Sequence, residues 1–443
     1  MNRGEPATTF SKPTRTEVGS VFVSNYPPYS FWGMDQVPQA REALERPAAP
    51  GTPLGLYLHI PFCRKRCKFC YFKVYTEKTS GEVRRYLEAL AREVELLAAM
   101  PAIRGRPLEF VYVGGGTPSF ISAKHLRTLA DRLEAAVSWD GVREVTFECE
   151  PGTLTRPKLE AIREVGVTRL SLGVENFDDA ILESNGRAHL SKEIRRVTPW
   201  IRALDFDQVN VDLIAGMVGE TWESWKDTVA KTIEMDPDSV TIYQMELPFN
   251  TVYSRQMLNG ATDVPIADWE TKRAWHDYAF ERLEQAGFEI SSAYTVVRPN
   301  GSPRFVYRDS VWHGCDLLGT GVASFSHVGG VHFQNDAGWE PYLNRIEAGE
   351  LPIDRAFAAS DTERLTREMI LQLKLGRLDT AYFTRKFGVD VLNEFEPAFR
   401  SLEAEKMLEV HDGSVRLTRQ GLLRVDSLLP AFYAPQYHGA RYT

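Results

Sequence analysis

The stretch His59-Ile60-Pro61-Phe62-Cys63-Arg64-Lys65-Arg66-Cys67-Lys68-Phe69-Cys70 decides how the rest of the chain is interpreted. It holds three of the five cysteines of the chain, in a C-x3-C-x2-C spacing. Three thiolates on one short loop can bind three irons of a [4Fe-4S] cluster and leave the fourth iron open to a ligand. The apolar run Leu56-Tyr57-Leu58 before the loop predicts a buried strand. The loop therefore follows the carboxyl end of a strand, where α/β barrels carry their active sites.

Two other roles for these cysteines are less favoured. A structural zinc site usually has two C-x2-C pairs, and here the fourth ligand would have to be His59 or Cys149. A disulfide with one free thiol suits a secreted chain, and nothing in this sequence marks one. Cys149 and Cys315 stand alone and are expected to be small buried residues.

Composition describes an ordinary globular chain of 443 residues, with 43% hydrophobic and 25% charged residues. The length suggests two or three domains. A formal net charge of −8 argues against nucleic acid as the main partner and against an anionic membrane surface. No apolar run approaches the roughly 18 residues of a membrane span, and the N-terminus lacks the apolar core of a signal peptide. We expect a cytoplasmic protein, which the few, clustered cysteines also favour.

Strands and helices are predicted to alternate through the first part of the chain. Helices are expected where apolar residues recur at helical spacing, and strands where short apolar runs end in a glycine or a polar residue. The expected strands are 56–58, 110–113, 145–147, 170–174, 209–214 and 239–243, and the helices 83–97, 122–137, 156–165, 178–185, 191–203 and 222–235. A longer helix and a strand are expected within 266–290. This alternation predicts βα units around a parallel sheet.

Four segments are expected along the chain. They are an N-terminal extension or lid (1–53), a barrel (54–300), a barrel extension that contacts cofactor (301–359) and a small C-terminal domain (360–443). The extension shows little periodicity. Its aromatic patch Tyr26–Trp32 is either a strap packed across the barrel or a cover for the active-site mouth.

The C-terminal segment opens with a capping box, Ser360-Asp361-Thr362-Glu363. Helices near 379–387, 390–406 and 418–429 and a hairpin turning at Asp412-Gly413 complete an order typical of a small winged helix. Because the chain is acidic, a packing or substrate-covering role is favoured over binding of nucleic acid.

The cysteine loop, with an aromatic residue before its last cysteine, resembles that of the radical SAM superfamily. The string Tyr57-Leu58-His59-Ile60-Pro61-Phe62-Cys63 resembles its HemN-like branch, the oxygen-independent coproporphyrinogen oxidase family. The resemblance spans residues 54 to about 430. It implies a partial (β/α)6 TIM-type barrel with a small winged-helix-like domain. It also implies a [4Fe-4S] cluster on Cys63, Cys67 and Cys70, reductive cleavage of S-adenosylmethionine, and a 5′-deoxyadenosyl radical, chemistry that belongs to the cofactors.

The resemblance assigns cofactor contacts at the predicted strand ends. The run Gly114-Gly115-Gly116-Thr117-Pro118 lacks GxGxxG spacing, and alone it is equally a tight turn. Gly115, Gly116 and Thr117 match the family's methionine-binding run. The other matches to the first cofactor are Tyr57 and Glu148. The matches to a second S-adenosylmethionine are Phe69, Gly116, Thr117, Glu175, Arg187, Asp212 and Met245. Arg187 could pair with a carboxylate, and Asp212 with a ribose hydroxyl or Arg187.

One more cofactor contact is expected from the glycine-punctuated run Leu317–Phe325, in which Phe325 is the candidate. Glycines there allow close approach of backbone to a ligand, or merely a tight bend. The basic residues of the cysteine loop, Arg64, Lys65, Arg66 and Lys68, are either a solvated face or a docking site for an acidic flavodoxin- or ferredoxin-type electron donor.

Three departures from the family bear on the substrate. Glu175 stands where the oxidase branch usually has Gln, and Tyr71-Phe72-Lys73 replaces its Gly-Cys-Asn run. Tyr307-Arg308 stands where the heme-chaperone branch has a His-Asn pair. These departures favour a third branch, in which two S-adenosylmethionine molecules serve C-methylation or cyclopropanation of a small-molecule secondary metabolite, as in antibiotic biosynthesis. Coproporphyrinogen dehydrogenase is the alternative, and a heme chaperone ranks third.

Overall fold

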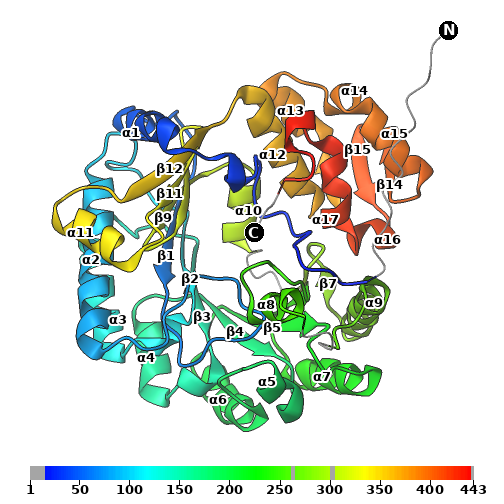
Figure 1. The fold of residues 1–443 in the computed structure, drawn as a ribbon, viewed down its shortest axis with the longest axis horizontal. Coiled ribbons are helices and arrows are strands. Elements are labelled where there is room, and N and C mark those ends of the chain that lie inside the picture. Colours follow the sequence, from blue (N-terminus) through cyan, green and yellow to red (C-terminus); the bar gives the residue numbers. More distant parts are fainter. Residues whose placement is uncertain (1–14, 261–264, 300–304, 441–443) are drawn as a thin grey trace.

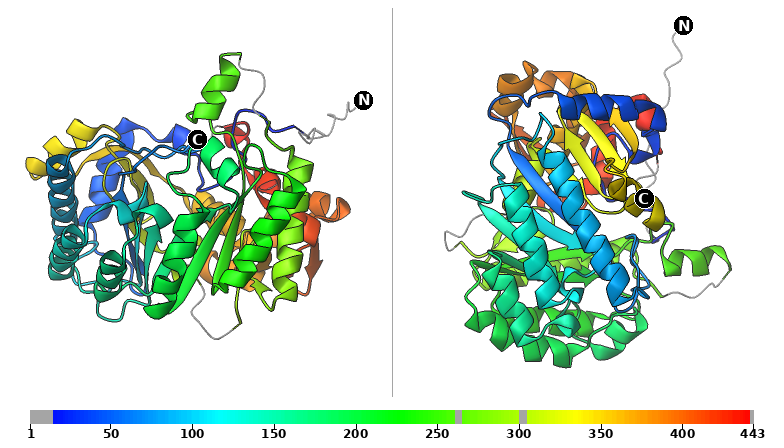
Figure 2. Two further views of the ribbon diagram at one scale, coloured as in Figure 1. Left: turned by 90° about the horizontal axis from the view of Figure 1, so that it is seen from below. Right: turned by 90° about the vertical axis from the view of Figure 1, so that its left-hand side faces the viewer.

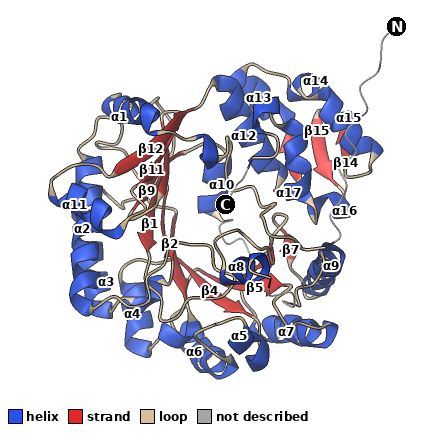
Figure 3. Cartoon of the chain, viewed as in Figure 1, coloured by secondary structure: helices blue, strands red, loops and turns tan. Residues whose placement is uncertain are grey.

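The computed structural model describes residues 15–260, 265–299 and 305–440, and one large sheet forms its centre. Six strands of this sheet run parallel in chain order, and helices cover their outer side (Figures 1 and 3). These strands are β1 (Leu54–Ile60), β2 (Phe110–Gly115), β3 (Glu144–Cys149), β4 (Arg169–Glu175), β5 (Gln208–Ala215) and β6 (Ser239–Gln244). The predicted α/β fold with six parallel strands is confirmed.

The covering helices follow the predicted order. They are α2 (Ser80–Ala98), α3 (Ala123–Ala136), α4 (Arg156–Glu164), α5 (Asp179–Ser184), α6 (Ser191–Ala203) and α7 (Trp222–Met235), with short 3-10 turns η3 (Pro118–Phe120) and η4 (Pro151–Thr153). Local signals set their starts, because Thr79 and Glu82 form a capping box and Asp178 accepts two backbone N–H groups of α5. Their apolar faces bury residues such as Leu90 and Ile162 against the outer side of the sheet.

The sheet continues beyond the six predicted strands on both edges. On one side lie β9 (Asp316–Thr320), parallel to β1, and then the antiparallel β10 (Phe325–Val328), β11 (Val331–Asn335) and β12 (Ile353–Ala358). On the other side lie β8 (Thr295–Val297) and β7 (Glu289–Ile290). The remaining helices of this region are α8 (Val252–Leu258), α9 (Trp269–Gln285), α10 (Val306–Trp312) and α11 (Trp339–Glu347). Figure 2 shows α8 projecting from the body of the barrel.

The glycine-punctuated run Leu317–Phe325 thus forms the end of β9 and the start of β10. A Cβ on Gly319 would lie 2.0 Å from the carbonyl oxygen of Phe325, and one on Gly321 would lie 2.4 Å from the hydroxyl of Tyr86. These glycines therefore serve close packing of the chain on itself. The expected boundary at 300/301 lies outside the described residues, as do residues 1–14 of the expected extension.

The N-terminal extension is more structured than its composition indicated. It contains α1 (Val37–Glu45) and the turns η1 (Tyr29–Phe31) and η2 (Met34–Gln36). Before them, the segment from Thr16 to Trp32 runs between the barrel and the C-terminal elements (Figure 1). Tyr26 is buried against Tyr433 and Tyr437, with ring centroids 5.0 and 5.3 Å away, so the extension is a strap packed on the rest of the chain.

The same strap also reaches the barrel mouth. Gly19 forms a bridge with Leu247 just after β6, and the Val21 amide donates to the carboxylate of Glu246. The buried Lys272 donates to Thr16 and to the carbonyl of Met245. The residues that make these contacts precede the aromatic patch Tyr26–Trp32, so a role of the patch itself as a cover for the mouth stays a prediction.

The C-terminal elements form a three-stranded antiparallel sheet flanked by helices. They are α12 (Asp361–Leu373), β13 (Arg377–Asp379), α13 (Thr380–Phe387), α14 (Val391–Glu394), α15 (Glu396–Ala404), β14 (Leu408–His411), β15 (Ser414–Leu417), α16 (Arg419–Leu422), α17 (Val425–Leu428), η5 (Leu429–Phe432) and η6 (Pro435–Tyr437). The capping box at Ser360 is confirmed, as is the hairpin, whose turn residues Asp412 and Gly413 have φ angles of 45° and 74°.

Two predicted helices in this part are wrong as single elements. The helix expected over 390–406 is broken at Phe395, because Pro397 lacks the N–H that would continue the bonding from α14 into α15. The helix expected over 418–429 is two short helices, interrupted at Arg424, whose backbone is not helical. No described helix is both long and apolar enough to cross a membrane.

Candidate active site

The cysteine loop leaves the carboxyl end of β1 and is held there by backbone and aromatic contacts. The Cys63 amide donates to the carbonyl of Tyr75 at 3.0 Å, and the Tyr75 amide donates to the carbonyl of Pro61 at 2.7 Å. Phe62 is fully buried and packs edge-on against Tyr86, with ring centroids 5.3 Å apart. Cys63 is buried, whereas the other two cysteines are half-buried. The loop therefore presents its three thiols from a fixed base.

Side chains from the end of β2 and from the segment after α5 donate to these sulfurs. The Thr117 hydroxyl lies 3.4 Å from Cys63 Sγ, and Arg187 Nη1 lies 3.4 Å from Cys67 Sγ. Gly116 also packs against the loop, because a Cβ there would come within 3.0 Å of both Cys63 Sγ and the carbonyl oxygen of Phe62. Donors aimed at sulfur and a glycine-lined cradle suit thiolates that ligate a bulky inorganic group.

Without a bound cation, two thiols of the loop are weak acids. Burial raises the pKa of Cys63 to about 11 and that of Cys70 to about 12, and in both cases the nearby Cys67 adds to the increase. Thiols of this kind become thiolates when a cation binds them. Cys149, on β3, lies among the apolar packing of the core, as expected for a small buried residue. Among the described residues, no three His, Cys, Asp or Glu side chains could hold a single metal ion.

The substitution Gly116→Ala should weaken binding of the cluster. The added Cβ should push on Cys63 Sγ and on the loop backbone, and overpacking of this kind costs about 1–3 kcal/mol. We expect a lower iron content after anaerobic reconstitution and a lower melting temperature of the reconstituted protein. Gly81→Ala, where a Cβ meets only the Thr79 hydroxyl at 4.0 Å, is the matched control. Equal iron contents in the two variants would contradict the placement of Gly116.

Three carboxyl groups gather at the carboxyl ends of β3, β4 and β5. Glu148 accepts hydrogen bonds from the Tyr112 hydroxyl at 2.7 Å and from the Gly115 amide at 3.1 Å. Burial raises the pKa of Glu148 to about 7, and the neighbouring Asp212 adds to the increase. Burial likewise raises the pKa of Glu175 to about 7. A group of mutually repelling, partly neutral carboxyls favours a cationic ligand among them.

Arg187 is paired with Glu175 rather than with Asp212. Its Nη2 lies 3.5 Å from the Glu175 carboxylate and donates to the carbonyl of Gly173 at 2.7 Å. Asp212 instead accepts from the Ser171 hydroxyl at 2.8 Å and from the Asn210 amide at 2.9 Å. The structure therefore does not show the expected ion pair between Asp212 and Arg187.

The other expected contacts lie around this centre in separate groups. Tyr57 stacks on Tyr112 with centroids 5.8 Å apart, and its hydroxyl lies 3.2 Å from His59 Nδ1. Gly115 has a φ of 121° and leaves no space for a Cβ beside His59. Phe69 and Met245 belong to one apolar cluster next to the loop. Phe325 is 42% exposed and contacts the rings of the strap residues Tyr29 and Trp32.

Sequence reasoning missed several polar residues that line the strands. Tyr112 on β2 and Tyr243 on β6 face the cluster of three carboxyls. Glu150 lies two residues after Glu148. Glu150 binds His189 and Arg64, whose contacts, despite burial, lower the pKa of this carboxyl to about 2. Period-two alternation along β2 and β6 could have indicated Tyr112 and Tyr243, whereas Glu150 lies just beyond the end of β3, where no alternation marks it.

Comparisons with known proteins agree with this site. The profile of the Radical SAM superfamily matches residues 57–231, and that of the HemN C-terminal domain matches residues 359–424. A similar protein is the oxygen-independent coproporphyrinogen III oxidase of Pseudomonas aeruginosa, 28% identical over 90% of each chain. Another is the heme chaperone HemW of Bacillus subtilis, 26% identical over 85% of this chain and 98% of that protein. The structure of coproporphyrinogen III oxidase (HemN) from Escherichia coli has the same fold, with a TM-score of 0.81, 23% identity, and coverage of 93% of this chain and 96% of that one.

A parallel barrel, a three-cysteine loop and these matches define a radical SAM enzyme. Within that superfamily the chain belongs to the HemN-like family, and its cofactors are a [4Fe-4S] cluster and S-adenosylmethionine. The thiols, the side chains that donate to them and the close packing at Gly116 fit the cluster. The three carboxyls, of which Glu148 bonds to the Gly115 amide, fit the positively charged S-adenosylmethionine.

Proposed function

We propose that this enzyme uses one S-adenosylmethionine as a radical source and a second as a carbon donor, and methylates or cyclopropanates a small secondary metabolite. The single observation that carries the proposal is the group of three carboxyls, Glu148, Glu175 and Asp212, with Arg187 beside one of them. Each cofactor molecule carries a positive sulfonium and an ammonium group. With its negative carboxylate included, each molecule has a net charge of +1, whereas the three ionised carboxylates together with Arg187 have a net charge of −2, enough for two molecules.

The mouth of the barrel supports an uncharged aromatic substrate. Tyr71, Phe72 and Tyr243 keep 37%, 44% and 43% of their surface exposed. Tyr71 and Phe72 stack with centroids 4.4 Å apart. Exposed aromatic faces beside carboxylates favour a flat apolar molecule and disfavour a polyanion.

Oxidative decarboxylation of coproporphyrinogen is the second candidate, because relatives over most of the chain carry that name. Its substrate needs basic partners for four carboxylates. Arg169 and Arg308 have buried nitrogens without a hydrogen-bond partner among the described residues, and the positive charge of Arg169 acts on Glu148 and Asp212, so these two arginines are the observation that favours this candidate. Heme trafficking has less support, since Tyr307 and Arg308 replace the expected heme ligand and Tyr307 packs on Tyr112 at 4.3 Å.

In this mechanism the residues of the protein bind the cluster and S-adenosylmethionine and orient them. Cys63, Cys67 and Cys70 would hold the cluster, which supplies the electron that cleaves the sulfonium bond. Gly115 and Gly116 would let the backbone approach the methionine end of the cofactor, and Glu148 would take up its cation. Arg187 would balance charge at Cys67 and orient Glu175, and the strap beside Glu246 would limit the entry of water.

The test is an anaerobic incubation with dithionite, S-adenosylmethionine and candidate substrates. We expect 5′-deoxyadenosine together with S-adenosylhomocysteine, and a product heavier by one methyl or methylene group that carries label from methyl-labelled cofactor. Coproporphyrinogen run in parallel is expected to yield no carbon dioxide. Carbon dioxide release without S-adenosylhomocysteine would replace the proposal with the dehydrogenase.

A further inference from the structure

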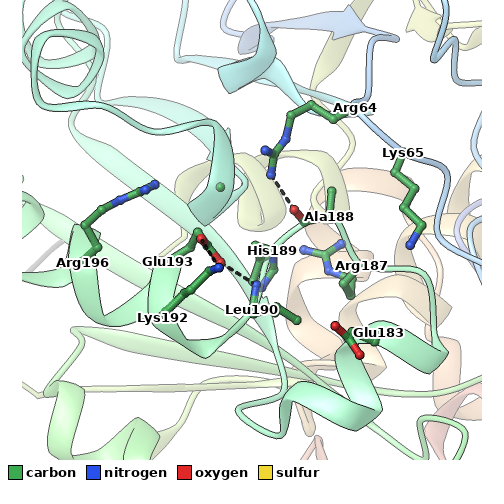
Figure 4. Close-up of a pocket in the computed structure, with 11 residues that line it drawn as sticks. Arg64, Lys65, Glu183, Arg187, Ala188, His189, Leu190, Lys192, Glu193 and Arg196 are labelled. Carbon is green, nitrogen blue, oxygen red and sulfur yellow. Dashed lines mark hydrogen bonds and ion pairs between the residues drawn. The ribbon is translucent and has the colours of Figure 1, made fainter.

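A basic concave site lies beside the cysteine loop, outside the barrel centre (Figure 4). Its volume is about 350 Å3, and it is formed by the loop, the turn after β3 and the segment from the end of α5 into α6. Five of its side chains are basic and two are acidic, and two of the basic ones pair with carboxylates outside the lining, so the site keeps a net charge of about +1 on a chain of net charge −8. The basic ones are Arg64, Lys65, Arg187, Lys192 and Arg196.

This site differs from the basic loop expected from the sequence. Arg66 turns to the carbonyl of Cys70 at 3.3 Å, and Lys68 lies over the ring of Tyr253 at 5.8 Å. Neither lines the concave site, whereas Lys192 and Arg196, more than a hundred residues away in the sequence, do. The positive surface next to the cysteines is therefore built from two separate segments of the chain.

The inner and outer basic residues of the site have different partners. Arg64 is neutralised by Glu150 at 3.1 Å, and Arg187 is paired with Glu175. On the rim, Lys65 has no ion pair among the described residues, and Lys192 is 71% exposed and only loosely paired with Glu193 at 3.9 Å. A small anion would need unpaired donors that converge at the base, whereas exposed charge along a rim suits the face of an acidic protein.

The base of the site is one side chain from a cluster ligand. Arg187 lines the site (Figure 4). Its Nη1 also lies 3.4 Å from Cys67 Sγ. Arg64, which directly follows Cys63, donates to the carbonyl of Ala188 at 2.6 Å, so the loop and the rim are fixed to each other.

We propose that this concave site docks an acidic, low-potential electron-transfer protein of the flavodoxin or ferredoxin type. The inference rests on the radical SAM activity but not on the identity of the substrate. One electron leaves the reduced donor and enters the protein at the cluster, and the oxidised donor then dissociates. Rim charges steer the encounter, so the interaction depends on salt.

The test is the triple variant Lys65→Glu, Lys192→Glu and Arg196→Glu. Its matched control reverses three exposed arginines of the C-terminal domain, Arg385, Arg400 and Arg416. Binding of an oxidised acidic flavodoxin to immobilised protein, without S-adenosylmethionine, should weaken at least tenfold in the triple variant only. Formation of 5′-deoxyadenosine driven by the reduced flavodoxin should fall similarly and lose most of its salt dependence, whereas the dithionite-driven rate stays unchanged.

Three results would overturn the docking site. The first is equal binding of flavodoxin by the triple variant and the control. The second is an equal loss in the dithionite assay, which would place these charges in the active site. The third is competition by inorganic phosphate against flavodoxin at constant ionic strength, which would make this a small-anion site. Because 5′-deoxyadenosine is measured without substrate, failure of the methylation proposal leaves these readouts intact.

Discussion

Cys67→Ala should abolish the iron–sulfur absorption of the reconstituted protein and reduce 5′-deoxyadenosine formation to background. Three thiolates bind three irons of the cluster and leave the fourth open. Loss of one thiol leaves a second iron without a protein ligand, and two thiolates cannot retain the cluster in its active form. Loss of residues that only support a ligand costs about 10–100-fold, and removal of a ligand itself should exceed that. Absorption spectra, iron analysis and anaerobic assays measure the effect.

Cys149→Ala is the matched control, because it removes a thiol of the apolar core that lies outside the cysteine loop. It should keep full iron content and activity, with at most a small loss of stability. If Cys149→Ala lost the cluster while Cys67→Ala kept it, the ligand assignment would be wrong. Tightly bound zinc in place of iron in the native chain would have the same consequence.

Local signals explain which parts of the fold could be predicted. The hairpin at Asp412-Gly413 and the capping box at Ser360 depend on a few adjacent residues, and both are present. The break at Phe395 was missed because apolar periodicity continues across it and outweighed Pro397. Strand β9 was missed because its pairing partner, β1, is about 260 residues earlier in the chain, and no local pattern marks that contact.

The same distinction holds for the candidate site. The cysteine loop could be recognised because all three thiols lie within eight positions. The partners of these thiols could not, because Thr117 and Arg187 reach the sulfurs only when β2 and the segment after α5 meet at one end of the sheet. The pairing of Arg187 with Glu175 depends likewise on the backbone at Glu175, which has a φ of 64°.

A buried carboxyl with a raised pKa links stability of the free protein to binding of the cofactor. With the pKa of Glu148 raised from 4.5 to about 7, its ionisation costs the fold about 3 kcal/mol, at 1.36 kcal/mol per pH unit. The folded state then binds the proton more tightly than the unfolded state does. Stability is therefore lost as pH rises from about 4.5 to 7, and the full cost applies above that range.

Glu148→Gln should remove this cost and also remove the charge that a cationic cofactor needs. Below about pH 4.5 the variant and the native chain should be equally stable, and near pH 8 the cofactor-free variant should be more stable by up to about 3 kcal/mol.

The affinity of this variant for S-adenosylmethionine should fall about 10–100-fold, as expected for loss of a charge-assisted hydrogen bond. In the native chain the affinity should rise with pH through about 7, and in the variant it should change less.

Glu93→Gln separates the two effects. Burial also raises the pKa of Glu93 to about 7, but this residue lies on α2 and binds Tyr342, Asn335 and the amide of Gly321, not the Tyr112 and Gly115 partners of Glu148. Calorimetric titration should give it native affinity for S-adenosylmethionine and a native pH profile. A loss of affinity shared by both variants, or a flat native profile between pH 6 and 8, would mean that the Glu148 carboxylate does not contact the cofactor, because only a group that ionises at the binding site links affinity to its own pKa.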